Sequence, residues 1–475
     1  MSNPPVAVAS GPSPSSSSFG EATNSPVVRP PSSRFNWYYS TGCQAIIIGA
    51  VSFLGVGMYN ALSGLGAGGL ASTHTWNVAT ALLFTFLCVT CIFAPVIINQ
   101  FNLRWTLSIA SCTYSLYAAS LYVNSKNGNE WFLILANVLN GIGGGLYYCS
   151  EGAIVVGYPE EKRRGRMISI WIFARNLGPI VGGAILLGIN KQTNGTGSVS
   201  LNSFAAFVGI TCAAPFIALL LASPEKVQRK DGTRVVVHKT TLRTEVNSLF
   251  RHLRSRKVLL LLPIFFTSWF ADSLNSNYTA TYLTVRTRAL SSFLSPFAGN
   301  IASFLSGRFL DSQIGTRGSR ATYTLGFFFA MNLAMWAYSA ANYAHYTSLP
   351  TSPHFDWSSS GFGRAYLIPF FWNFEELGCQ AMLYYLLGTI SDDLQDLVHL
   401  TGILRGIEGA GQAVAYGIAS STASIWVTIG LGFGLVVVSY PLAFLVVRDI
   451  EEKEPTVPAV EEEKADSLDQ KDLEV

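Results

Sequence analysis

The chain is dominated by uninterrupted apolar segments of about twenty residues, separated by short polar connections. An α-helix needs about 20 apolar residues to cross the hydrocarbon core of a bilayer. Only 12% of the residues are charged, against about 25% in a soluble domain, which is too few to cover a soluble surface of this size. We predict about twelve membrane-spanning helices, at 43–63, 75–99, 103–123, 131–157, 167–189, 202–222, 258–283, 289–310, 321–344, 364–390, 401–422 and 425–447.

Three polar segments organise the chain around these helices. Residues 1–40 are rich in Ser and Pro and are predicted to form a disordered cytoplasmic tail, and 449–475 form an acidic disordered tail. The segment 223–257 carries ten Lys or Arg residues and is the longest interior gap. It is therefore predicted to be a basic cytoplasmic linker between an N-terminal six-helix bundle, 41–222, and a C-terminal one, 258–448.

Lys and Arg are concentrated in alternate connections. The connections on the side of the two termini include the basic linker, Arg104 and the run from Lys162 to Arg166, whereas the opposite connections carry few basic residues. Because cytoplasmic loops are enriched in Lys and Arg, we predict a multi-pass membrane protein with both termini in the cytoplasm. Plasma membrane and endomembrane both remain open. Asn194 begins an Asn-Gly-Thr sequon in an outer connection, which makes the chain a candidate glycoprotein.

The two halves repeat short patterns at equivalent places. A Leu-Tyr-Tyr triplet that contains Tyr147 in the fourth predicted helix returns in the tenth around Tyr384. Arg175 in the fifth predicted helix is matched by Arg405 in the eleventh, and Gly residues follow both. Parallel duplication of a six-helix unit is one known transporter plan. Chance matching of such short motifs is the alternative.

Several motifs resemble the major facilitator superfamily. Its cytoplasmic signature, Gly-x-x-x-Asp followed by Gly and Arg, is matched in the second half with one residue inserted; in the first half Asn99 stands where the acid is expected, ahead of Arg104. The fifth predicted helix contains a Gly-Pro-x-x-Gly-Gly segment similar to that of antiporters. The Gly-rich fourth helix, from Asn140 to Gly152, resembles the fungal Unc-93-like branch. The other motif residues are Gly307, Asp311, Gly315 and Arg317, and Gly178, Pro179, Gly182 and Gly183.

The resemblance covers about residues 40 to 447 and implies an all-α membrane fold of two six-helix halves. It implies a central cavity lined by the first, fourth, seventh and tenth helices. It leaves two functions open, since some relatives of this branch regulate or traffic other membrane proteins instead of carrying solutes. The missing acid at Asn99 fits a protein that need not cycle between states.

Ionisable side chains inside the predicted helices are the sharpest functional signal, because each costs at least about 2.5–3.5 kcal/mol at a helix centre. Asp272 and Glu376 lie at similar depth, roughly 20 Å from the inner ends of their helices at about 1.5 Å per residue, and the resemblance places both on cavity helices. Two such carboxylates facing one cavity would make a proton or substrate site, with Glu376 facing the cavity and Glu375 pointing elsewhere. A structural hydrogen-bonding role for the pair is the other interpretation, and the sequence favours it.

Four other intramembrane charges predict ion pairs. Glu151 and Arg175 lie at similar depth on adjacent helices, and Arg405 and Glu408 share one helix face because they are three residues apart. A structural latch is the favoured role for the first pair, with substrate contact by Glu151 as the alternative.

The aromatic residues Tyr147 and Tyr384 are candidates for lining a solute cavity, with ordinary packing as the alternative. The predicted partners are the lipid bilayer, a small solute, a proton, and in the regulator alternative another membrane protein. The chain has no features of a nucleic-acid-binding protein. It has no cofactor motif and no metal-ligand spacing, and no His or Asp cluster suits enzyme chemistry.

Overall fold

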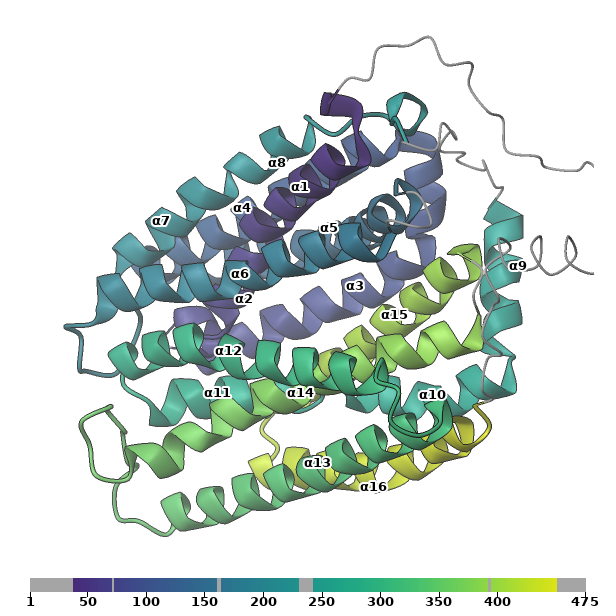
Figure 1. Cartoon of the computed structure of the whole chain (residues 1–475). Coiled ribbons are helices and arrows are strands. Elements are labelled where there is room, and N and C mark those ends of the chain that lie inside the picture. The colour runs from purple at the N-terminus through teal and green to yellow at the C-terminus, as the bar shows by residue number, and fades with distance from the viewer. Residues whose placement is uncertain (1–36, 71, 160–163, 230–241, 392–393, 451–475) are drawn as a thin grey trace, which may run out of the picture.

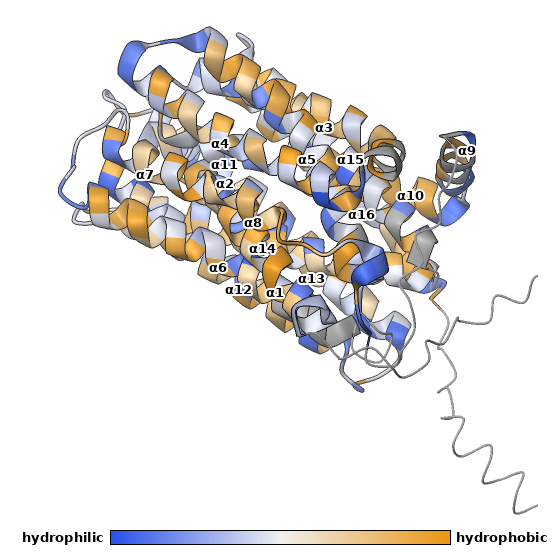
Figure 2. Ribbon diagram, turned by 90° about the horizontal axis from the view of Figure 1, so that it is seen from above, coloured by the Kyte–Doolittle hydropathy of each residue, from blue (hydrophilic) through white to orange (hydrophobic). Residues whose placement is uncertain are grey.

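The computed structural model describes residues 37–70, 72–159, 164–229, 242–391 and 394–450, and its helices run side by side in one bundle (Figure 1). Most of both predicted tails lies outside the described residues. The loops and helix ends are the most hydrophilic parts, and the long helices are mainly apolar (Figure 2).

The N-terminal half forms six spans, as predicted. The first consists of α1 and α2 joined by a π-helical turn at Phe53–Gly57, and the last consists of α7 and α8. The helices are α1 (Thr41–Ser52), α2 (Met58–Ser63), α3 (Thr73–Phe101), α4 (Leu103–Asn127), α5 (Glu130–Gly157), α6 (Arg164–Asn190), α7 (Leu201–Thr211) and α8 (Ala213–Ala218).

The C-terminal half also forms six spans, but its first span is broken. The continuous helix predicted at 258–283 is interrupted by a hydrogen-bonded turn at 268–271, which divides it into α10 and α11. The helices are α10 (Arg256–Thr267), α11 (Asp272–Tyr282), α12 (Val285–Leu310), α13 (Arg317–Thr347), α14 (Phe362–Ile390), α15 (Leu394–Ser420) and α16 (Ile425–Arg448). A further helix, α9 (Leu242–Leu253), lies within the basic linker, where no helix was predicted.

Seven of the spans are apolar and long enough to cross a membrane on their own composition. The other five, α4 and α12 to α15, contain more Ser, Tyr, amide and ionisable residues. Neighbouring helices can satisfy such polar groups inside a bundle, where lipid cannot. The polar side chains of these helices therefore identify the faces that point inward.

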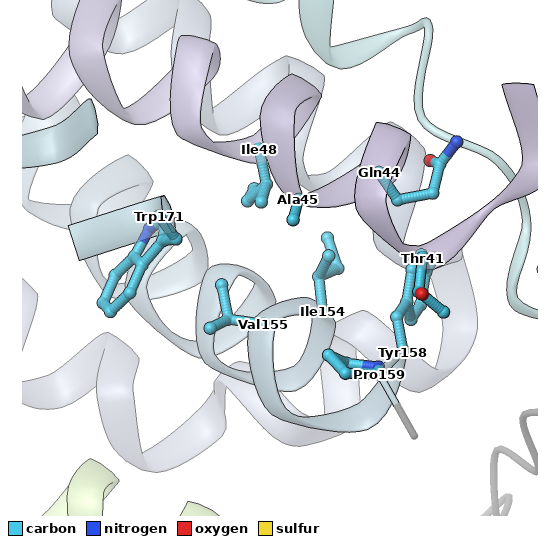
Figure 3. A pocket seen from close by; sticks show the side chains of 9 residues that line it. All are labelled: Thr41, Gln44, Ala45, Ile48, Ile154, Val155, Tyr158, Pro159 and Trp171. Atoms are coloured by element: carbon cyan, nitrogen blue, oxygen red, sulfur yellow. The ribbon is translucent and has the colours of Figure 1, made fainter. Parts of the chain in front are cut away.

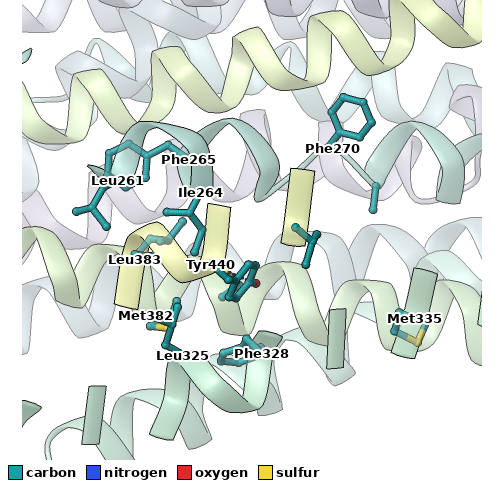
Figure 4. Close-up of a cluster of buried hydrophobic side chains, with 14 of the residues drawn as sticks. Leu261, Ile264, Phe265, Phe270, Leu325, Phe328, Met335, Met382, Leu383 and Tyr440 are labelled. Atoms are coloured by element: carbon teal, nitrogen blue, oxygen red, sulfur yellow. Dashed lines mark hydrogen bonds between the residues drawn. The ribbon is translucent and has the colours of Figure 1, made fainter. Parts of the chain in front are cut away.

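Each half has its own hydrophobic core. One cluster consists of buried side chains from 258 onward, including Phe265, Phe328 and Tyr440 (Figure 4). The N-terminal half is filled by separate clusters, one of which also takes in Val285, Ala289 and Tyr416 from the other half. This shared cluster lies in the seam between the halves, where α3 packs against α15 and α6 against α12.

The seam is closed at the end of the bundle opposite α9. Arg288, at the start of α12, is buried and donates to the carbonyls of Leu65 (2.7 Å), Gly66 (2.7 Å) and Gly197 (2.7 Å) of the N-terminal half. Ser276 in α11 accepts a hydrogen bond from the backbone N–H of Ala67 (3.0 Å). Side-chain and backbone bonds thus join the two halves at this end.

Candidate substrate and proton site

The first spans of both halves are interrupted at the same height. α1 and α10 are each 12 residues long, and the π-helical turn follows α1 as the hydrogen-bonded turn follows α10. Interrupted helices free backbone groups and are frequent at transporter binding sites. Asp272 is the first residue of α11, directly after the break, so the fold presents this carboxylate where the helix is discontinuous.

Asp272 faces a neighbouring helix and the other half. Its Oδ2 accepts hydrogen bonds from Tyr416 OH (2.9 Å) and Gln412 Nε2 (3.3 Å), both in α15. Tyr416 in turn stacks against Phe84, in α3 of the N-terminal half, with 6.0 Å between the ring centroids. Asp272 thus combines the hydrogen bonds of a structural role with a position at the seam.

Glu376, in α14, is buried, and α14 packs against α11, the helix that begins with Asp272. Its Oε1 has no hydrogen-bond partner among the described residues. A buried ionised carboxylate without a compensating partner is costly. The two acids singled out from the sequence thus lie on neighbouring helices, and Glu376 has no neutralising contact among the described residues.

Glu375 points away from this pair. Its Oε1 accepts from Asn332 Nδ2 in α13 (2.8 Å) and from Tyr440 OH in α16 (3.3 Å). Successive residues of an α-helix are rotated by about 100°, so adjacent glutamates of α14 face different neighbours. Glu375 belongs to the packed interior of the C-terminal half.

An ion pair lies on α15 one turn before Gln412, the residue that bonds Asp272, on the side toward α9. Arg405 Nη1 lies 3.1 Å from Glu408 Oε2, and Ser268 Oγ, in the break after α10, donates to Glu408 (3.4 Å). Gln380, one turn along α14 from Glu376, can turn its amide to donate to Glu408 (3.3 Å) or to accept from Arg405 Nη1 (2.7 Å) and Trp269 Nε1 (3.1 Å). The first span of the C-terminal half, α14 and α15 thus each place polar side chains at two successive levels, one around Asp272 and one around Glu408.

The N-terminal half holds a matching arrangement around Glu151 in α5. Glu151 accepts a short hydrogen bond from Ser52, the last residue of α1, and another from Trp171 Nε1 (2.8 Å). Arg175 Nη1 lies 3.8 Å from Glu151 Oε2. In both halves, a serine beside the helix interruption bonds a buried glutamate that faces an arginine.

The two arginines approach the same aromatic ring. The guanidinium carbons of Arg175 and Arg405 lie 5.4 Å and 5.2 Å from the ring centroid of Tyr148. Arg405 also lies 5.5 Å from the ring of Tyr384, whereas Tyr147 is fully buried and donates to Ser52 Oγ (3.3 Å). The structure therefore separates the two candidate tyrosines: Tyr384 borders the arginine cluster and Tyr147 packs behind it.

Sequence reasoning missed the uncharged members of this site, Gln380, Gln412, Tyr416 and Ser268. A signal for them exists in the helical spacing of α15. Arg405, Glu408, Gln412 and Tyr416 recur at intervals of three and four residues, which places them on one helix face. A search of the sequence for all polar residues at intervals of three and four, instead of for charged residues alone, would have identified this face of α15.

The turn between α12 and α13 contains the residues that resemble the cytoplasmic signature of the superfamily. Gly315 adopts a positive φ of 70°, and Arg320, outside the motif, holds the turn by donating to the carbonyls of Leu310 (3.0 Å) and Gly315 (2.8 Å). Among the described residues, no ion pair joins Asp311 or Arg317 to a partner. Gly307 lies in the last turn of α12. The side chain of Asn99 lies outside the described residues, and Arg104 packs against the Trp105 ring (5.9 Å).

The glycines of the antiporter-like segment lie at helix crossings. A Cβ on Gly178 would lie 2.5 Å from Gly57 Cα, and a Cβ on Gly183 would lie 2.4 Å from the carbonyl oxygen of Ser292 in the other half. Gly182 approaches Ala61 in the same way (2.6 Å), and Pro179 lies inside α6. These residues allow close packing of α6 against both halves.

Asn194 is exposed in the connection between α6 and α7. Its neighbours Thr193 and Gly195 accept backbone hydrogen bonds from Arg286 (3.0 Å) and Val285 (2.9 Å) at the start of α12. The sequon thus lies beside the seam, at the closed end.

A small cavity separates α1 from α5 and α6 near their α9 ends (Figure 3). It is lined by Thr41, Gln44, Ala45, Ile48, Ile154, Val155, Tyr158, Pro159 and Trp171. Its volume of about 10 Å³ is that of a single water molecule. This cavity is too small for a solute, and the candidate site remains the polar cluster along the seam.

Comparison with known proteins identifies the family. A family model described as "Ion channel regulatory protein UNC-93" matches residues 71–338. UNC93-like protein 1 of Arabidopsis thaliana is 30% identical over 87% of this chain and 91% of its own. The chain belongs to the UNC-93 family. Another relative, Notoamide biosynthesis cluster protein O' of Aspergillus versicolor, is 35% identical over 87% of this chain and 90% of its own. The predicted Unc-93-like resemblance is confirmed.

Solved structures confirm the fold of this UNC-93 family member. The xylose transporter XylE from E. coli, in a partially occluded inward-open conformation, aligns with a TM-score of 0.57 over 88% of this chain and 100% of that one, at 13% identity. A POT family transporter in complex with 5-aminolevulinic acid aligns with a TM-score of 0.58 over 84% and 94%, also at 13% identity. The chain therefore has the two-half architecture of major facilitator transporters, as predicted.

Proposed function

We propose that this UNC-93 family protein is a secondary carrier that moves a small organic solute by alternating access and couples its movement to a proton. The observation that carries the proposal is a pair of carboxylates inside the bundle, Asp272 and Glu376, which lie on the neighbouring helices α11 and α14 and have no basic partner in contact within the described chain. Two negative charges held in a low-dielectric interior are unfavourable, and one shared proton removes most of that cost.

The two-half fold supplies the movement. The halves are joined at one end by Arg288 and at the site itself by the aromatic ring between Arg175 and Arg405. Opening one end while closing the other requires only that the halves rock about this central cluster. Asp272 binds Tyr416 and Gln412 of α15, and Tyr416 stacks against Phe84 of the N-terminal half, so the surroundings of Asp272 would change in each cycle.

The organic nature of the solute is supported by the site and by one relative. Tyr148, Tyr384 and Trp171 surround the two arginines with aromatic surface. The relative of A. versicolor is named for a biosynthesis cluster, which fits a carrier of an organic metabolite. We also propose that both termini are cytoplasmic and that Asn194 is a glycosylated residue of the outer face, because the basic connections lie at the α9 end.

Transport by purified protein in liposomes tests this proposal. Solutes are screened for accumulation driven by an imposed pH gradient, and then for counterflow, in which labelled solute exchanges with unlabelled solute without net proton movement. Asp272→Asn and Glu376→Gln should abolish gradient-driven accumulation and preserve counterflow. Gradient-driven accumulation at the wild-type rate in both variants would remove the proposed coupling. Glu375→Gln is the matched control, because this carboxylate faces α13 and α16.

A second function is favoured by the family description, which names an ion channel regulatory protein. In that alternative the same fold serves as a regulator or trafficking partner of another membrane protein. It predicts stoichiometric co-purification with that protein from native membranes and no counterflow of any solute. Counterflow with the purified chain alone would exclude a purely regulatory role.

A further inference from the structure

We propose that Arg175 and Arg405 together form a binding site for an aromatic organic carboxylate. This inference deepens the proposed carrier function and rests on it for the role of the ligand as transported solute. The site would lie at the seam between the halves, on the α9 side of the Asp272–Glu376 pair.

The two arginines occupy equivalent positions in the duplicated halves. Arg175 lies in α6, the fifth span of the first half, and Arg405 lies in α15, the fifth span of the second half. Both guanidinium groups lie against the ring of Tyr148, at 5.4 Å and 5.2 Å. A single small ligand beside this ring would therefore be within reach of both halves.

Much of the hydrogen-bonding capacity of both groups is unused. A guanidinium has five N–H donors. Arg175 donates no hydrogen bond to the described residues and has only the 3.8 Å ion pair with Glu151. Arg405 pairs with Glu408 through Nη1, which can also donate to the turned Gln380 amide, and its guanidinium bonds Tyr384; its buried Nε has no partner within the described chain. Paired N–H donors in this fork geometry match the two oxygens of a carboxylate.

Both arginine side chains keep some accessible surface. Arg175 is 17% exposed and Arg405 is 12% exposed, whereas their glutamate partners are 2% and 3% exposed. Each arginine is paired on its buried side with a glutamate, and its exposed surface lies on the other side of the guanidinium group. An anion can approach from that side without first unfolding the cluster.

Aromatic surface beside the guanidinium groups indicates what the body of the ligand should be. The rings of Tyr148, Trp171 and Tyr384 each contact one or both arginines. Aromatic rings favour offset or edge contacts with one another, so a planar ring attached to the carboxylate fits best. Since each arginine already faces one glutamate, the incoming carboxylate competes with Glu151 and Glu408.

Equilibrium binding to the purified full-length protein in nanodiscs tests the inference. The probes are benzoate, phenylacetate and cinnamate, each measured by calorimetry against its uncharged primary amide. We expect at least one acid to bind, with its amide at least about tenfold weaker, because the charged hydrogen bonds to two guanidinium groups are lost. Arg175→Gln and Arg405→Gln should each weaken the acid by about tenfold or more. Arg308→Gln, which removes an exposed arginine of α12, should bind as wild type.

A gain of binding separates this site from a structural role. Glu151→Gln keeps an acceptor oxygen for Ser52 and Trp171 but removes the competing charge, so the acid should bind several-fold more tightly. Equal binding of acid and amide, no binding by any of the three acids, or unchanged affinity in both arginine variants would overturn the inference. Because no proton gradient is present, this result is independent of the transport assay: carboxylate binding without proton coupling would contradict only the proposed function.

Discussion

Replacing Arg288 with Met should open the end of the bundle opposite α9. Arg288 is 1% exposed and donates to three N-terminal carbonyls at 2.7 Å, those of Leu65, Gly66 and Gly197. It has no carboxylate partner in the described chain. Its bonds therefore join the two halves, and Met fills similar space without a donor.

The magnitude follows from these bonds. A hydrogen bond from a charged donor contributes about 1.5–3 kcal/mol net, so the three short bonds together give at least about 4 kcal/mol. Burying the guanidinium costs part of this, and we expect the closed arrangement to lose roughly 2 kcal/mol. That change corresponds to about a thirtyfold shift toward the open arrangement, since about 1.4 kcal/mol is a factor of ten.

Maleimide labelling of a cysteine at Ser276 measures this opening. Ser276 is buried at the seam and accepts from Ala67 N, so Ser276→Cys reports access to the joint. In nanodiscs both faces are accessible, and the parent chain with its natural cysteines gives the background rate. Arg288→Met should raise the labelling rate about thirtyfold. The control is Arg364→Met, because Arg364 bonds Asn342 within the same half. A labelling rate within twofold of the parent value would refute the reasoning.

Three further predictions test other parts of the structure. Gly183→Ala should also accelerate labelling of the seam by about tenfold, because the added Cβ would meet the Ser292 carbonyl at 2.4 Å; Gly188→Ala, which meets nothing within 4 Å, should not. Asp356→Asn should lower the unfolding temperature by a few degrees at neutral pH. The N–H donors of Arg286 hold the pKa of Asp356 well below its usual range. The ionised Asp356 therefore stabilises the fold at pH values above the ordinary aspartate pKa, and this stabilisation is lost as the pH falls through the lowered pKa of the folded protein. A difference in unfolding temperature between Asp356→Asn and wild type that stayed constant over this pH range would contradict the prediction. Asn194→Gln should remove an endoglycosidase-sensitive shift in gel mobility, and a wild-type protein without such a shift would contradict the outer placement.

Hydropathy alone identifies seven of the spans, and the more polar spans and the two six-helix halves were predicted with the help of the charge pattern and the family resemblance. Hydropathy could not reveal the break before Asp272. The sequence Ser-Trp-Phe-Ala at 268–271 contains neither Gly nor Pro, so nothing local distinguishes it from a helix. The linker helix α9 was missed for a different reason: its Lys- and Arg-containing segment was interpreted only as a connection.

The candidate site was partly predictable. Glu151 and Arg175 could be paired from their depth, and Arg405 and Glu408 from their spacing. The approach of Arg175 and Arg405 to one tyrosine depends on how α5, α6 and α15 rotate about their axes across the seam. Sequence spacing within one helix carries no information on that rotation. Uncharged members such as Gln412 were missed because only ionisable residues were weighed.

Infrared difference spectroscopy of the purified protein tests proton binding by the Asp272–Glu376 pair most directly. Spectra are recorded in nanodiscs as the pH is changed, in light and heavy water, and the carbonyl stretch of a protonated carboxylic acid is followed. We predict an isotope-sensitive band that disappears in Glu376→Gln, shifts in Asp272→Asn, and persists in Glu375→Gln. A band unchanged in both Asp272→Asn and Glu376→Gln would contradict a shared proton at the seam.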